Sequence, residues 1–104
     1  MENLNQVYAN KVFIGVDGIS AKHGCTVPTD PEAEVVRRMI ERTKGQVIVV
    51  ADHSKWGVVS NFQVASIDEV DKFISDDKLD SSAVELLADH GVSCLLANTT
   101  ANPA

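Results

Sequence analysis

Two short apolar runs, at residues 11–16 and 46–51, constrain the fold more than any other feature. Neither alternates between apolar and polar residues, which is typical of strands covered on both faces in a parallel sheet. Thr29 or Asp30 can serve as the N-cap of a helix over residues 31–43. Its apolar stripe at helical spacing consists of Val36, Met39, Ile40 and Thr43. The pattern predicts a right-handed strand, helix, strand unit in which both strands end at the same edge of the sheet.

Weaker signals continue the alternation of strands and helices along the rest of the chain. They predict two strands, a helix and a last strand, at residues 62–65, 72–74, 82–90 and 93–97. Ser82 and Glu85 have the spacing of a capping box, and Gly91 is a suitable stop for the helix. The sequence therefore predicts a single α/β domain, in keeping with its 104 residues.

The charge balance argues against nucleic acid as a direct partner of this segment. Nine lysines and arginines face 15 aspartates and glutamates, so the net charge of -6 repels a phosphate backbone. Cys25 and Cys94 lack the spacing of a metal knuckle or a redox pair, and we expect free, reduced thiols. No signal peptide or membrane span is recognisable, which favours a cytoplasmic location. The small polar tail, residues 98–104, is expected to fray.

The residues that follow the two central strands are the first candidates for a site, because α/β sheets bind ligands beyond the carboxyl ends of their strands. Asp17 offers a carboxylate there, and Gly18 allows a positive φ or a close approach to a ligand. An ordinary Asp-Gly turn explains the pair equally well.

Lys55 is the sharper candidate, since a lysine four residues beyond an apolar strand can reach over the sheet edge to a phosphate or carboxylate. A lone surface lysine is the common alternative, but Asp52, His53 and Ser54 crowd the same turn. His53 lacks a nucleophile motif nearby and is read as a loop histidine.

Glu34 and Arg37 lie in the first turns of the predicted helix, where backbone amides favour anions, and they are the remaining ligand-binding candidates. Their alternative role is a solvated face, with the i, i+4 pairs Glu34–Arg38 and Arg37–Glu41. Three scattered histidines do not make a zinc site, and the phosphate loops of nucleotide-binding proteins are absent. We therefore predict no metal, no cofactor and no catalytic residue.

Three blocks of sequence, at residues 13–20, 34–40 and 50–57, resemble the C-terminal sensor domain of DeoR-family bacterial transcription regulators. The similarity covers about residues 8–97 in the family's order and spacing. It implies a partial parallel-sheet domain with the ribose-5-phosphate isomerase-like, Rossmann-like fold. It further implies a sensor for a phosphorylated sugar or related metabolite, and a separate winged helix-turn-helix domain that binds DNA.

Carried over by position, the resemblance gives Asp17 and Gly18 contacts with sugar hydroxyls and gives Lys55 the cationic role, with Glu34 and Arg37 auxiliary. Residues 1–97 then form the C-terminal part of the sensor domain. The DNA-binding domain and the family's upstream glycine-rich phosphate loop are not in this sequence. Trp56 stands where the family often has Phe.

Two other functional classes remain open at this point. A carboxylate, Asp17 or Glu34, beside Lys55 could move a proton between adjacent carbons, as in a sugar-phosphate isomerase. Exposed sheet edges favour a homo-oligomer, and the chain could serve oligomerisation alone.

Overall fold

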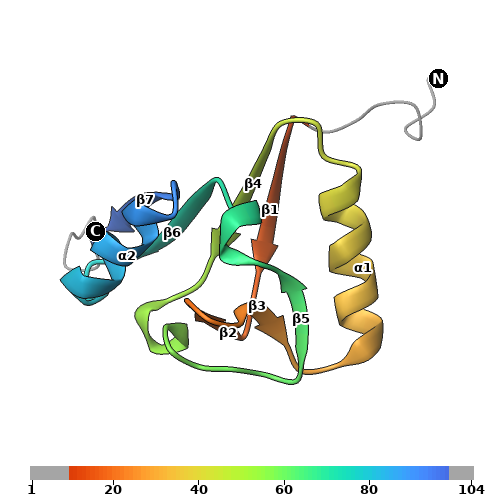
Figure 1. Ribbon diagram of the computed structural model, residues 1–104, viewed down its shortest axis with the longest axis horizontal. Helices are drawn as coiled ribbons and strands as arrows, with labels where there is room; N and C mark the ends of the chain where they lie inside the picture. The colour runs from red at the N-terminus through yellow and green to blue at the C-terminus, as the bar shows by residue number, and fades with distance from the viewer. Residues whose placement is uncertain (1–9, 99–104) are drawn as a thin grey trace, which may run out of the picture.

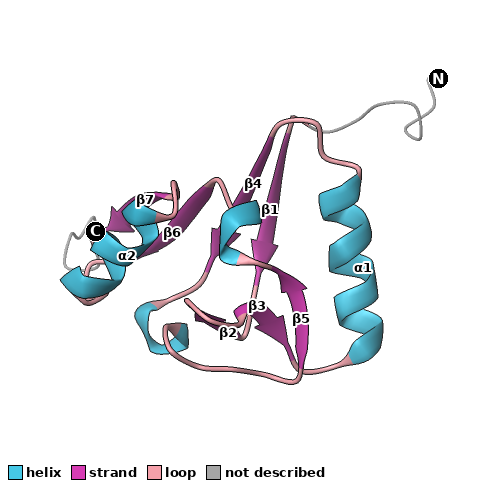
Figure 2. Cartoon of the chain, viewed as in Figure 1, coloured by secondary structure: helices cyan, strands magenta, loops and turns pink. Residues whose placement is uncertain are grey.

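The computed structural model describes residues 10–98, in which three strands come before the first helix and strands and helical segments alternate afterwards (Figures 1 and 2). The elements, in chain order, are β1 (Lys11–Gly15), β2 (Gly18–Ser20), β3 (Gly24–Val27), α1 (Asp30–Glu41), β4 (Gln46–Val50), the 3₁₀ turn η2 (His53–Lys55), β5 (Phe62–Ala65), the 3₁₀ turn η3 (Ile67–Glu69), β6 (Lys72–Asp76), α2 (Ser81–Asp89) and β7 (Ser93–Ala97).

Four of the strands form a parallel sheet in the order β1-β4-β6-β7. The two apolar runs are neighbours in it, with Phe13 opposite Ile48 and Gly15 opposite Val50. This confirms the predicted α/β class and brings the carboxyl ends of β1 and β4 to one edge. β6 is longer than predicted and ends at Asp76, which places a carboxylate at that same edge.

A second, antiparallel sheet in the order β2-β3-β5 was not predicted as a sheet. β5 matches the predicted strand at residues 62–65, but it joins this small sheet and not the parallel one. Gly24 makes the β2–β3 hairpin feasible, because its φ is +69° and an added Cβ would lie 2.2 Å from the Ala65 carbonyl oxygen.

Helix α1 packs on the small sheet and on β1, and it stands to one side of β1 in Figure 1. The Thr29 hydroxyl accepts from the Glu32 amide at 3.4 Å, so Thr29 is the N-cap. Ala33 and Val36 form the buried stripe, whereas Met39 is 40% exposed, which corrects the predicted stripe at that position.

Helix α2 begins one residue earlier than predicted, with Asp80 as its N-cap. The predicted Ser82–Glu85 capping box is therefore wrong, since Ser82 donates to the Asp80 carboxylate instead. A capping box occurs at Ser66 and Glu69, where the Glu69 carboxylate accepts from the Ser66 amide at 2.8 Å. Gly91, with a φ of +80°, ends α2 as predicted.

Within residues 10–98 only one face of the parallel sheet is covered, contrary to the prediction that its strands are covered on both. Alternation and register place six apolar residues on the other face, which we call the open face: Phe13, Ile48, Val50, Ile74, Leu95 and Ala97. Phe13 is 58% and Leu95 55% exposed, while Ile48 is buried between its neighbours. The sequence did not reveal this because both faces carry apolar side chains.

The core lies on the covered face and includes Phe73 and Leu87, both fully buried, with Trp56 and Phe62 packed against it. Both cysteines are free thiols, and burial raises the pKa of Cys25 to about 12. Of the predicted tail, residues 99–104 lie outside the described residues. Within residues 10–98 no helix is long and apolar enough to cross a membrane.

We expect Gly18→Ala to lower the free energy of unfolding by about 1–3 kcal/mol, the usual cost of overpacking. The added Cβ would lie 2.2 Å from the Val58 carbonyl oxygen, which is backbone and cannot rotate away. Gly15→Ala is the matched control, since nothing lies within 4 Å of its added Cβ. Urea unfolding of the two variants checks this, and equal midpoints would contradict it.

Candidate functional site

The turn that follows β4 is built by the side chain of Asp52. Its carboxylate accepts from the Ser54 amide at 2.8 Å and from the Ser54 hydroxyl, an arrangement typical of aspartate at the start of a turn. The Trp56 amide then donates to the His53 carbonyl at 3.1 Å and closes η2. Gly57, with a φ of +85°, turns the chain back and donates to the Ile19 carbonyl at 2.7 Å.

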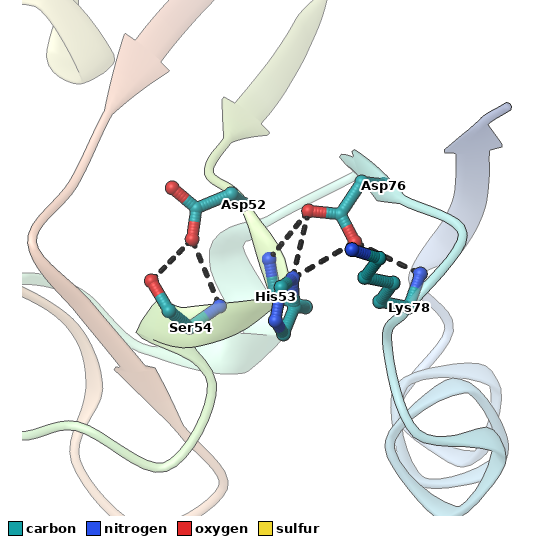
Figure 3. Close-up of polar contacts among 5 residues, drawn as sticks. All are labelled: Asp52, His53, Ser54, Asp76 and Lys78. Carbon is teal, nitrogen blue, oxygen red and sulfur yellow. Dashed lines mark hydrogen bonds and ion pairs between the residues drawn. The ribbon is translucent and has the colours of Figure 1, made fainter. Parts of the chain in front are cut away.

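Asp76, the last residue of β6, joins this turn to the next strand of the sheet through hydrogen bonds (Figure 3). Its carboxylate accepts from the His53 amide at 3.0 Å and lies 3.0 Å from the His53 Nδ1. It also accepts from the Lys78 amide at 2.9 Å. One carboxylate thus joins the turn after β4 to the turn after β6.

These hydrogen bonds favour the charged forms of both carboxylates. The His53 side chain, followed by the His53 amide, lowers the pKa of Asp76 from 3.8 to about 2. The Ser54 hydroxyl, followed by the Ser54 amide, lowers the pKa of Asp52. The turn therefore carries two fixed negative charges at neutral pH.

A hollow of about 240 Å³ lies at the carboxyl edge of β4 and β6. It is lined by Val50, Ala51, Asp52, Ile74, Ser75, Asp76 and Ala97. Val50 and Ile74 belong to the open face, so the hollow is the edge of that face. Ser75 has a buried hydroxyl without a hydrogen-bond partner among residues 10–98, but alternation puts it on the covered face.

Carboxylate oxygens of Asp52 and Asp76 and a ring nitrogen of His53 all lie within 4.8 Å of one another. These three side chains are the ones in the described part of the chain that could hold a metal ion. Asp52 Oδ1 and His53 Nδ1 already take part in the hydrogen bonds described above. The chemistry that the geometry shows directly is hydrogen bonding by an ordered His–Asp pair.

Lys55 ends η2 and is half-buried. Its ammonium group forms no hydrogen bond or ion pair with any residue of the described range 10–98, although it attracts the nearby Asp52. Asp17 is exposed and lies on the neighbouring segment, which a bridge between Ile19 and Trp56 joins to the turn. The expected proximity of the two strand-end loops is thus confirmed.

Gly18 has a different environment from the one expected. It is buried in β2, its φ is not positive, and the Val58 backbone fills the space over its Cα. The close approach that Gly18 permits is therefore to Val58 of the same chain. Its proposed contact with a ligand remains a prediction.

Glu34 and Arg37 lie on α1, away from the turn after β4. The Arg37 guanidinium donates through Nε and Nη2 to the Gln63 carbonyl, at 3.0 and 2.5 Å, and lines a separate hollow of about 250 Å³ between α1 and β5. The predicted pair with Glu41 is replaced by this contact. Glu34 forms the predicted exposed pair with Arg38, at 3.4 Å.

Sequence reasoning missed the partner of His53. Asp76 follows a short, partly polar run that predicted a strand only as far as residue 74. The rule applied to Asp17 and Asp52, that residues beyond parallel strands meet at one edge, would have found Asp76 once β6 had its full length. His90, one of the three scattered histidines, also has an acidic partner, because its Nδ1 lies 3.0 Å from the Asp68 carboxylate.

Comparison with known proteins places this geometry in context. A family model described as the DeoR C terminal sensor domain matches residues 1–77. The transcriptional repressor GlcR of Bacillus subtilis is 42% identical over 95 residues, covering 84% of this chain and 36% of GlcR. The regulator GlpR of Haloferax volcanii is 37% identical over 82 residues, covering 79% of this chain and 32% of GlpR. The chain spans about a third of the length of the curated relatives it matches.

We expect acid to destabilise the native chain more than an Asp76→Asn variant. The pKa of Asp76 is lower in the folded state, so its contribution is complete above about pH 4 and is lost as the pH falls toward 2. Urea unfolding midpoints from pH 5 to pH 2.5 measure this, and the variant should show the shallower fall. Asp89→Asn, at an exposed aspartate, is the control and should follow the native curve.

Proposed function

Because the chain belongs to the DeoR family of transcriptional regulators, we propose that it senses a phosphorylated sugar or related metabolite. Effector binding then controls the DNA affinity of a winged helix-turn-helix domain elsewhere in the regulator. The chain itself binds the effector without turning it over, and it shifts the populations of two states of the intact protein.

The observation that carries this proposal is the position of Lys55. A half-buried lysine whose ammonium group has no hydrogen bond within residues 10–98 is available to a ligand, and its charge suits a phosphate group. It stands at the carboxyl edge of a parallel sheet, where such sheets bind ligands. Asp17, on the adjoining segment, is the candidate for sugar hydroxyls, with Gly18 shaping the backbone beside it.

The wider assignment follows from the same family. The four-stranded parallel sheet and its helices are compatible with part of a ribose-5-phosphate isomerase-like fold. In this proposal residues 1–97 form the C-terminal part of the sensor domain. The regulator acts in the cytoplasm, and the outer edges of β1 and β7, which pair with no strand among residues 10–98, suit a homo-oligomer. Glu34 and Arg37 are auxiliary at most, since both are engaged on α1.

The isomerase alternative has weaker support. It needs a carboxylate beside Lys55, and Glu34 is held on the exposed side of α1 by Arg38, which leaves Asp17 on the adjoining segment as its candidate base. The relatives described above are named as regulators. We therefore prefer a binding role.

Calorimetry of the intact regulator with a panel of hexose and pentose phosphates tests the proposal. We expect one of them to bind, and Lys55→Ala to weaken that binding roughly ten- to a hundredfold, the effect of losing a charged hydrogen bond. Lys22→Ala, at an exposed lysine of the β2–β3 turn, is the control. Equal binding by native protein and Lys55→Ala would reject the role of Lys55, and turnover of a sugar phosphate would favour the isomerase.

A further inference from the structure

The protonation of the His53 ring follows from its partner. Asp76 accepts three hydrogen bonds, and its lowered pKa keeps it ionised at neutral pH. An ionised carboxylate can only accept, so the ring nitrogen that faces it, Nδ1, carries a proton. In the neutral ring this leaves Nε2 as a hydrogen-bond acceptor. The side chain of His53 is 43% exposed, whereas that of Asp76 is only 14% exposed.

The charge around the hollow decides which part of a ligand suits it. Asp52 and Asp76 are two of its lining residues, but the surface that the hollow exposes is almost entirely apolar, with Val50, Ile74 and Ala97 among the contributors. A phosphate group would be repelled by the two neighbouring carboxylates, whereas a hydroxyl group can donate to a carboxylate or to an imidazole nitrogen. The half-exposed His53 ring, two residues before Lys55, is therefore placed for the neutral, hydroxylated part of a ligand whose anionic part lies at Lys55.

We propose that His53 is a further ligand-binding residue, which accepts a hydrogen bond from an effector hydroxyl through Nε2, and that Asp76 is the residue that positions it. This inference rests on the proposed function and deepens it. His53 would bind a sugar hydroxyl, and Lys55 would bind the phosphate group. His53 and Lys55 both lie in η2, whose backbone amides donate to the carboxylates of Asp52 and Asp76.

Calorimetry of the intact regulator with the sugar phosphate that binds best, its singly deoxygenated analogues and inorganic phosphate tests this. We expect His53→Phe to weaken binding of the sugar phosphate about tenfold, as for one lost hydrogen bond. Binding of inorganic phosphate should stay unchanged, and one deoxy analogue should bind native protein and variant equally. His53→Gln keeps an acceptor and should lose less.

Asp76→Asn should weaken binding by a similar factor, with a signature that a merely structural residue would not give. Nitrogen NMR of the ring should show the Nδ1-protonated tautomer of His53 in the native protein and a mixture of tautomers in the variant. The chain offers a matched control pair in His90 and Asp68, which are joined by the same contact at 3.0 Å. His90→Phe and Asp68→Asn should change neither the affinity nor the His53 tautomer.

Three outcomes would overturn the inference. If His53→Phe binds the sugar phosphate as tightly as native protein, while Lys55→Ala does not, His53 has no part in binding and the proposed function stands. If His53→Phe loses sugar phosphate and inorganic phosphate to the same extent, its role is structural. If the native regulator binds no phosphorylated sugar, the proposed function fails and the inference fails with it.

Discussion

Parallel pairing of β1, β4, β6 and β7 is the constraint on which the rest of the structure depends. Parallel strands run in the same direction, so each connection has to lead from the carboxyl end of one strand back to the amino end of the next. The connection from β1 to β4 contains β2, β3 and α1. The connection from β4 to β6 contains η2, β5 and η3. The small sheet thus arises from the return paths of the large one.

The same constraint explains why the site is made of turns. Chain segments that leave β1, β4 and β6 start at one edge, and their first polar residues meet there: Asp17, Asp52 and Asp76. Asp17 and Asp52 follow the apolar strands β1 and β4, and Asp76 is the last residue of the partly polar β6. What joins two of them is His53, through its amide and its ring. Arg37 has a comparable structural role elsewhere, because it ties α1 to the backbone of β5.

Local patterns in the sequence were sufficient for β1, β4, β5, the body of α1 and the end of α2 at Gly91. Strands of three and four residues, such as β2 and β3, carry too little periodicity to be recognised, and their pairing depends on the contact of Gly24 with Ala65. Arg37 donates to a backbone carbonyl, a group that every residue has, so the sequence does not indicate which residue accepts. For the site, residue type and position single out Lys55, whose role stays a prediction, whereas the pairing of His53 with Asp76 required the register of β4 and β6.

The open face gives the sheet an unusual relation to its site. Val50 and Ile74 belong both to that face and to the hollow beside the two carboxylates. Any polypeptide or ligand that covers the open face would also cover the hollow. If the ligand proposed above reaches this hollow, whatever covers the open face also slows the escape of that ligand, so shielding of apolar surface and ligand residence time are coupled by geometry.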